Sequence, residues 1–309
     1  MKTTNQNTLA SSFVVLVILF TGMVMAAGGP RSFATPEDGV KAFVAALRID
    51  DKAMLSNVLG PDGEDIISSG DDTQYRNTVK AFLAAYDAHS DIARKGSSVA
   101  VLNVGKDEWQ LPIPLVKNAA GWHFDTVAGR REILARRIGR NEMAAIQATL
   151  AYVDAQREYA SQDRGDGVLD YAQRFISTPG KHDGLYWQTA DKAPLSPLGP
   201  TFAAAHSEGY GFGGPPSNSG PQPYHGYRYR ILTAQGPAAK GGVYSYFAGS
   251  HMIGGFALIA YPASYRVSGI TSFIVNQDGV VFQKDLGPNT ADIAGKMTEF
   301  NPGPGWTKA

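Results

Sequence analysis

Three carboxylates lie close together in the middle of the chain, in the segment Asp163-Arg-Gly-Asp-Gly-Val-Leu-Asp170. Asp163, Asp166 and Asp170 flank glycines, and oxygen ligands arranged around a turn are those that a hard cation such as calcium prefers. Gly165, however, stands where a calcium-binding loop usually supplies another oxygen. Two interpretations therefore stay open, a calcium site and a glycine-containing turn at the end of a helix. No other cofactor is predicted.

A segment rich in glycine and proline, residues 194–226, is the second candidate site. Gly209, Gly211 and Gly214 have the spacing of a dinucleotide-binding turn, but that motif requires a helix directly after it, and two prolines follow instead. We therefore predict an irregular loop that presents side chains to a partner, either an envelope protein or a small ligand. The candidate interaction residues are Tyr210, Phe212, Tyr224 and His225.

Five arginines lie within residues 130–140. Several of them are three or four residues apart, a spacing that places side chains near one another on a helix. Such a group could bind an anionic ligand or a lipid head group. Because Glu132 and Glu142 dilute the charge, a solvated helix face with local ion pairs is the alternative. The arginines are Arg130, Arg131, Arg136, Arg137 and Arg140.

The sequence contains no linear motif typical of nucleophilic catalysis. The Gly-x-Ser-x-Gly and Ser-x-x-Lys patterns do not occur, and the absence of cysteine excludes thiol nucleophiles, thiolate metal sites and disulfides. Ser250 and His251 are neighbours on an expected strand and therefore point to opposite faces. We predict no catalytic residue. A hydrolase whose residues come together from distant positions stays open as the alternative.

Residues 33–128 are expected to form an N-terminal domain of helices on a small antiparallel sheet. Thr35 followed by Pro36 predicts a helix start, and Val79, Phe82 and Leu83 share one face of a later helix. From about residue 98 the apolar residues alternate, which indicates a strand meander. Helices followed by a curved meander predict an α+β module, similar in outline to the cone-shaped nuclear transport factor 2 domains and suited to a pocket.

Residues 129–309 are expected to form a second domain, a long helix packed on an antiparallel sheet. Residues 130–162 have a helical pattern on both sides of Gly139, and this segment is expected to form the hinge between the domains and the spine of the second. Short alternating segments resume at residue 227, and Asp278-Gly279 predicts a hairpin turn. The predicted fold class is therefore α+β. The apolar stripe of the helix is expected to comprise Met143, Ile146, Leu150 and Val153.

The N-terminus has the features of an export signal. Lys2 is followed by an apolar stretch and then by small residues, which predicts a signal peptide over residues 1–26 with cleavage after Ala26. The stretch is shorter than the roughly 20 residues that cross a bilayer, so no permanent membrane span is expected after cleavage. The expected location is periplasmic or secreted. Equal numbers of basic and acidic side chains, 28 of each, argue against nucleic acid as a partner.

The C-terminal part resembles a known family. The run that begins Gly255-Phe-Ala-Leu-Ile-Ala-Tyr-Pro and ends Lys284-Asp-Leu-Gly is similar to an uncharacterised bacterial family labelled domain of unknown function 2950. The segments Gly121-Trp-His-Phe-Asp and Gly226-Tyr-Arg-Tyr-Arg agree with it. The resemblance implies export to the bacterial envelope and no established activity. The helix with Tyr152, Gln156 and Tyr159 ahead of a sheet also resembles the globular part of a type IV pilin, without its processing site.

These observations together predict an exported envelope protein. The leading hypothesis is a non-enzymatic binding or assembly factor, because catalytic signatures are missing and a Gly/Pro loop is available to a partner. A periplasmic hydrolase is the alternative. A pocket with converging polar groups would favour the enzyme, and a flat apolar patch near residues 209–226 would favour the binding role.

Overall fold

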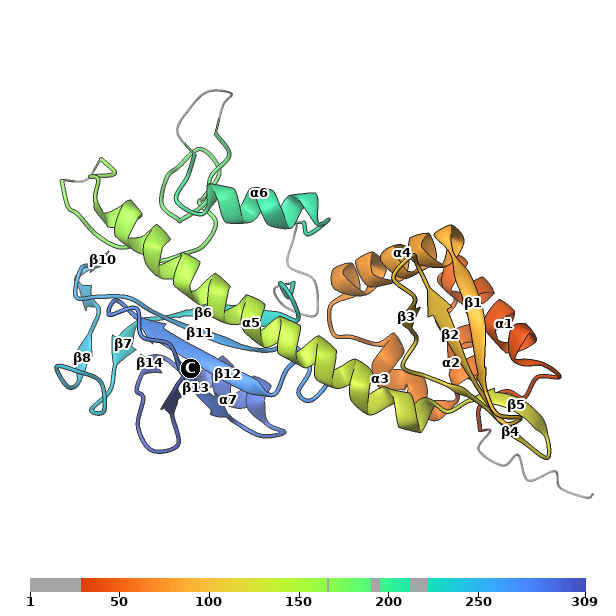
Figure 1. Ribbon diagram of the computed structural model, residues 1–309. Helices are drawn as coiled ribbons and strands as arrows, with labels where there is room; N and C mark the ends of the chain where they lie inside the picture. The colour runs from red at the N-terminus through yellow and green to blue at the C-terminus, as the bar shows by residue number, and fades with distance from the viewer. Residues whose placement is uncertain (1–28, 166, 190–194, 212–221) are drawn as a thin grey trace, which may run out of the picture.

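The computed structural model describes residues 29–165, 167–189, 195–211 and 222–309. Buried apolar side chains gather in two clusters, one drawn from residues 33–124 and the other from residues 145–300. We call the regions around them the N-terminal lobe and the C-terminal lobe. Figure 1 shows the two lobes at opposite ends of the molecule, joined by one long helix. The expected signal peptide lies outside the described residues.

The N-terminal lobe packs helices against a five-stranded antiparallel sheet. The strand order is β1-β2-β4-β5, with β3 beside β2. The helical segments are α1 (Pro36–Arg48), α2 (Lys52–Leu59), the 3-10 turn η1 (Pro61–Gly63), α3 (Glu64–Ile67) and α4 (Asp72–Ala88). The strands are β1 (Ser90–Lys95), β2 (Val99–Val104), β3 (Trp109–Gln110), β4 (Leu115–Asn118) and β5 (Gly121–Phe124).

Local capping explains where these helices begin. The Thr35 hydroxyl accepts the N–H of Asp38 at 3.1 Å, with Pro36 in the first turn, so the predicted start of α1 is confirmed. The Asp51 carboxylate caps α2 at 2.8 Å, and the Asp71 carboxylate caps α4 at 2.9 Å. Each of these side chains satisfies a backbone donor that the helix itself leaves unpaired.

The long helix α5 (Thr126–Ala160) runs for 35 residues without interruption. Its first part contacts η1 and α3 of the N-terminal lobe, and its second part contacts strands of the C-terminal lobe. Gly139, in the segment expected to form the hinge, lies inside the helix, and a Cβ added there would meet nothing within 4 Å. The helix therefore passes through the expected domain boundary. No helix in the described parts of the chain has both the length and the apolar character of a membrane span.

The C-terminal lobe is built on a second five-stranded antiparallel sheet, in the order β15-β13-β12-β11-β6. Helices α5 and α7 both contact β11, whose residues are almost all buried, so this strand lies at the centre of the core. The elements of this sheet are β6 (Tyr227–Leu232), β11 (Ala257–Pro262), β12 (Thr271–Asn276), β13 (Phe282–Asp285) and β15 (Thr307–Lys308), with α7 (Thr290–Lys296). The observed class is α+β, as predicted.

Short elements complete this lobe. One small sheet has the strand order β14-β7-β8, and β9 pairs with β10. These elements are α6 (Gly199–Ser207), β7 (Ala234–Gln235), β8 (Tyr244–Ser245), β9 (Phe247–Ala248), β10 (His251–Met252) and β14 (Glu299–Phe300).

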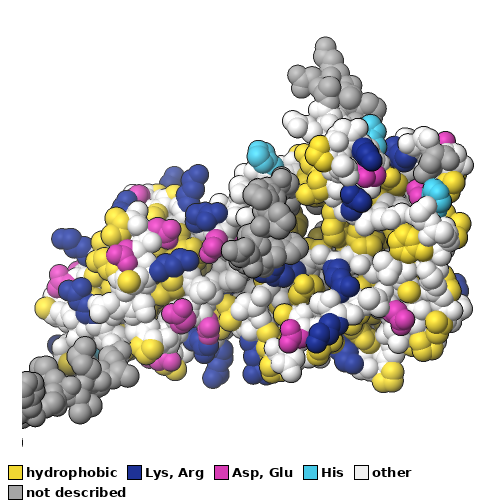
Figure 2. Space-filling model, turned by 180° about the vertical axis from the view of Figure 1, so that it is seen from behind, with side chains coloured by type: hydrophobic (Ala, Val, Ile, Leu, Met, Phe, Trp, Pro, Cys, Tyr) yellow, Lys and Arg dark blue, Asp and Glu magenta, His cyan; other side chains and the backbone are white. Residues whose placement is uncertain are grey.

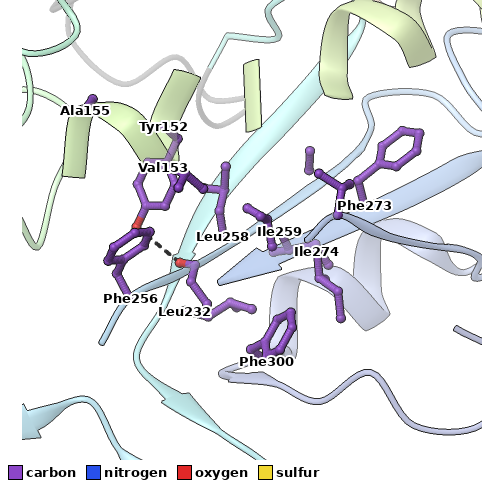
Figure 3. Close-up of a cluster of buried hydrophobic side chains, with 14 of the residues drawn as sticks. Tyr152, Val153, Ala155, Leu232, Phe256, Leu258, Ile259, Phe273, Ile274 and Phe300 are labelled. Atoms are coloured by element: carbon purple, nitrogen blue, oxygen red, sulfur yellow. Dashed lines mark hydrogen bonds between the residues drawn. The ribbon is translucent and has the colours of Figure 1, made fainter. Parts of the chain in front are cut away.

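The core of the C-terminal lobe forms where α5 meets the sheet. Tyr152 of α5 packs edge-to-face on Phe256, with ring centroids 5.6 Å apart, and its hydroxyl donates to the Ala257 carbonyl at 3.3 Å. Figure 3 shows Tyr152 and Val153 lying beside Phe256 and Leu258. Burial raises the pKa of the Tyr152 hydroxyl, which therefore stays a hydrogen-bond donor at neutral pH.

Charged side chains of both signs lie on one face of the molecule. On the face seen in Figure 2, basic and acidic side chains are interspersed over both lobes. This pattern is that of a mixed, solvated surface rather than of an extended basic face.

Candidate functional site

A pocket of about 590 Å³ lies inside the N-terminal lobe and is bordered by α1, α2, α4, the sheet and the first part of α5. Ligand sites in proteins typically measure roughly 300–1,000 Å³ and are mostly apolar. The lining of this N-terminal pocket is largely aliphatic and aromatic. It includes Phe43, Leu55, Phe82, Val104, Trp109, Leu111 and Ile113.

The pocket opens between α4 and α5. Its solvent-exposed lining residues are Thr78 and Ala81 of α4, Arg136 and Arg140 of α5, and Trp109 of β3. The Trp109 side chain is 44% exposed, which is unusual for a large aromatic ring beside an apolar interior. A ligand would therefore enter past a tryptophan ring and a pair of arginines.

The pocket exists because helix α4 is not packed closely against the rest of the lobe. An amphipathic helix normally buries its apolar stripe in a packed core, yet none of the 17 residues of α4 is buried. Val79 and Phe82 of that stripe line the pocket and are only half-buried. The Phe82 ring lies 5.9 Å from the ring of Phe43 and 6.5 Å from that of Trp109, so the three aromatic side chains form one connected part of the wall.

One face of α5 adds positive charge to the apolar wall. Ile133, Arg136, Arg137 and Arg140 all line the pocket, and their spacing of three, one and three residues places them on one side of a helix. The Arg136 side chain is paired with Glu132 at 2.7 Å and is thereby compensated. Neither aspartate nor glutamate occurs among the described residues that line the pocket.

Arg137 is the buried member of this group. Its side chain is only 8% exposed and donates to the carbonyl oxygens of Asp65 at 2.7 Å and Ile66 at 2.8 Å. Burial, and to a lesser extent the neighbouring charge of Arg140, lowers the pKa of Arg137 to about 10. The guanidinium stays protonated at neutral pH. Among the described residues, its side chain donates to backbone carbonyls and forms no ion pair with a carboxylate.

Tyr75 of α4 is a polar group on the pocket wall near Arg137. Burial raises the pKa of its hydroxyl, and the negative charge of Asp50 raises it as well, while Arg137 acts in the opposite direction. The phenol is therefore neutral at physiological pH and keeps a proton to donate. Tyr75 and Arg137 together give an apolar pocket a polar side.

Comparison with known proteins identifies the family. Residues 30–309 match the family described as Protein of unknown function (DUF2950). The chain belongs to this family. No curated protein and no solved structure matches the DUF2950 chain, so the comparisons supply neither an activity nor a structural relative, and the pilin-like and cone-like resemblances stay predictions.

The arginine-rich segment of this DUF2950 protein divides into two groups. Arg130 pairs with Asp65, and Arg136 pairs with Glu132, as expected for a solvated helix face with local ion pairs. Arg136, Arg137 and Arg140 line the pocket, and of these three only Arg136 has a carboxylate partner among the described residues. The sequence indicated the charge of this segment, but its spacing alone could not separate the two groups.

The predicted carboxylate cluster is only partly described. One carboxylate oxygen of Asp163 accepts the N–H groups of Gly165 at 2.9 Å and Gly167 at 3.0 Å, and Asp166 lies outside the described residues. Asp170 pairs with His251, with 3.1 Å between Oδ2 and Nδ1. Within the described ranges, no group of three or more histidine, aspartate or glutamate side chains could hold a metal ion. Calcium binding at this turn stays a prediction.

The predicted interaction residues lie close to the junction of the lobes. Tyr210 is buried, and its hydroxyl donates to the carboxylate of Asp71 at 2.8 Å. The backbone N–H of His225 donates to the same hydroxyl at 3.3 Å, and the half-buried ring of Tyr224 lies 4.2 Å from the His225 ring. Phe212 lies outside the described residues. These contacts give Tyr210 a structural role, and a partner for this segment stays a prediction.

The residues that line the pocket carry no distinctive sequence signal. Phe43, Phe82 and Leu55 occupy apolar stripes of helices, as the side chains of a closed core would. One feature of the sequence did point to an irregular region. Pro112 and Pro114 follow Trp109 and interrupt the alternating apolar residues, which does not fit a regular buried strand. Only the packing of distant segments shows that these side chains border a pocket.

Proposed function

We propose that this DUF2950 protein is an exported bacterial envelope protein that binds an apolar small molecule in the N-terminal pocket without transforming it. The observation that carries the proposal is the 590 Å³ pocket beneath α4, a helix whose apolar stripe is left half-buried. A ligand that covers that stripe would remove apolar surface from water, which favours binding by a free energy of roughly 25 cal/mol for each Å² buried. Binding in this pocket is the role that the geometry supports best.

The lining of the pocket favours binding over hydrolysis. A hydrolase needs a nucleophile, or an activated water, with a general base within hydrogen-bond distance. The pocket offers hydroxyl groups at Ser69, Tyr75 and Thr78, but neither histidine, aspartate nor glutamate is found in its described lining. A bound molecule would therefore meet hydrophobic contacts and positive charge rather than a base.

Replacement of Ala85 by phenylalanine tests the pocket directly. Ala85 lines the pocket from α4, so a benzyl group there would occupy ligand space. We expect the affinity for the neutral dye N-phenyl-1-naphthylamine, measured by fluorescence titration, to fall at least about tenfold, which corresponds to ~1.4 kcal/mol. The free energy of unfolding should change by less than the roughly 1–3 kcal/mol that overpacking a closed core costs.

Ala84 on the same helix provides the matched control. It is exposed and does not belong to the lining, so Ala84→Phe should leave dye affinity unchanged. Absence of dye binding by the unsubstituted protein would contradict the proposed function. Equal affinities of the Ala85→Phe variant and the unsubstituted protein would show that the dye binds elsewhere.

Export is tested separately. The signal-peptide pattern predicts that the protein isolated from the envelope or from the medium starts at Ala27. Intact-mass measurement of the protein expressed in a bacterial host checks the position of cleavage. A full-length chain that stays in the cytoplasm would contradict export and would leave the binding proposal standing.

A further inference from the structure

The charges that line the N-terminal pocket restrict the chemistry of its ligand, provided that the proposed binding function holds. Arg137 and Arg140 lie three residues apart on α5 and both line the pocket. We infer that the ligand is a single-chain amphiphile whose anionic head group, a carboxylate or a phosphate monoester, binds these two arginines while its apolar chain lies against the aromatic wall.

The first argument concerns the uncompensated charge. The buried Arg137 is only 8% exposed, and its side chain donates hydrogen bonds to two backbone carbonyls. Arg140 faces the same pocket, and within the described residues no ion pair of its side chain is found. Because both guanidinium groups are positively charged, they repel each other electrostatically. An anion bound between them would be attracted to both and would offset this repulsion.

The second argument concerns what a neutral ligand would cost. A molecule that fills the pocket displaces water from the arginine side chains at its opening. If the ligand carried no negative charge, the exposed Arg140 would lose solvation and neither Arg137 nor Arg140 would gain an anionic partner, which is unfavourable in an apolar environment. A carboxylate or phosphate replaces the lost water with charge-assisted hydrogen bonds, and the planar guanidinium fork matches the geometry of either group.

The third argument concerns orientation. Arg140 is exposed at the opening between α4 and α5, whereas buried lining residues such as Phe43 and Leu55 lie deeper in the lobe. An amphiphile therefore enters with its apolar chain first and keeps its head group beside Arg140, near solvent. Tyr75 lies on the wall near Arg137, where its phenolic proton could serve the same head group.

Competition against the neutral dye measures the preference for the head group. Dodecanoate, dodecyl phosphate, dodecanol and dodecyltrimethylammonium share one chain and differ in head-group charge. Below their micelle concentrations, we expect both anions to displace the dye at concentrations at least about tenfold lower than dodecanol, and the cation to be the weakest competitor. The ratio between the two anions distinguishes a carboxylate ligand from a phosphate ligand.

Substitutions on α5 locate the effect. Arg140→Gln should weaken dodecanoate about five- to tenfold and leave dodecanol unchanged, while Arg140→Lys should retain part of the preference. Arg131 provides the control, because it is an exposed arginine on the same helix and is absent from the pocket lining. Arg131→Gln should not alter the affinity of either ligand. Arg140 is exposed, so the test does not depend on disturbing the buried Arg137.

Two results would overturn the inference. One is dodecanol competing as well as dodecanoate, and the other is an equal loss of dodecanoate affinity in the Arg140→Gln and Arg131→Gln variants. In both cases dye binding and its loss in Ala85→Phe would still support an apolar pocket, so the inferred head group would fail while the proposed function stood. Failure of the dye itself to bind would reject the proposed function and the inference with it.

Discussion

Replacement of Asp71 by alanine is expected to lower the free energy of unfolding by roughly 3–5 kcal/mol. Asp71 is 2% exposed, and its carboxylate accepts three hydrogen bonds. They come from the Gln74 N–H at 2.9 Å, the Tyr210 hydroxyl at 2.8 Å and the Gly226 N–H at 2.8 Å. Alanine removes a helix cap and leaves two buried donors from the other lobe without an acceptor.

The neighbouring Asp72 is the matched control for this prediction. Its side chain is exposed and lies 3.5 Å from Lys52 in a surface ion pair, so Asp72→Ala should cost less than about 1 kcal/mol. Asp71→Asn should fall between the two alanine variants, because asparagine still caps a helix. Urea-induced unfolding measures all three. Similar losses in Asp71→Ala and Asp72→Ala would show that the lobes are held together by other contacts.

Two glycines on α5 are expected to respond to alanine with opposite signs. A Cβ at Gly129 would lie 2.6 Å from the Cγ1 atom of Ile113 and 2.7 Å from both the Ile113 Cα atom and the Pro112 carbonyl oxygen. Two of these three atoms belong to the backbone and cannot turn away. Gly129→Ala should therefore destabilise the protein by roughly 1–3 kcal/mol, in spite of the higher helix propensity of alanine.

At Gly139 the same substitution should be stabilising. A Cβ there meets nothing within 4 Å, so the gain in helix propensity, about 0.8–1 kcal/mol, is expected in full. Thermal and urea unfolding of both variants provide the measurement. A destabilised Gly139→Ala variant would mean that the helix bends at this residue, as an interdomain hinge would require. Stabilisation by Gly129→Ala would mean that the first turn of α5 does not approach residues 112–113 closely.

The buried face of α5 shows how far periodicity can be interpreted. The apolar stripe predicted from the sequence included Met143 and Leu150, but these side chains are 68% and 40% exposed. The buried face instead includes Gln156, whose amide donates to the Tyr152 hydroxyl at 2.9 Å and to the Ala172 carbonyl at 2.8 Å. A polar side chain can occupy a core position when distant backbone atoms satisfy it, and residue type alone does not reveal this.

The sequence by itself determined the local features of this protein. The helix start at Thr35, the change from helical to alternating periodicity, the α+β class and the family all follow from neighbouring residues or from the order of residues along the chain. These features depend on short-range hydrogen bonds and on the position of side chains on one element. They therefore need no knowledge of how the elements pack.

Only the tertiary structure decided where the site lies. Whether the stripe of α4 meets a packed core or a pocket depends on α1, the sheet and α5, which come from separate parts of the chain. The same packing places Arg137 and Arg140 at the pocket and leaves Arg131 in solvent, although all three belong to one basic run. The pocket exists only because several elements pack around it without filling it, so no single segment of the sequence encodes it.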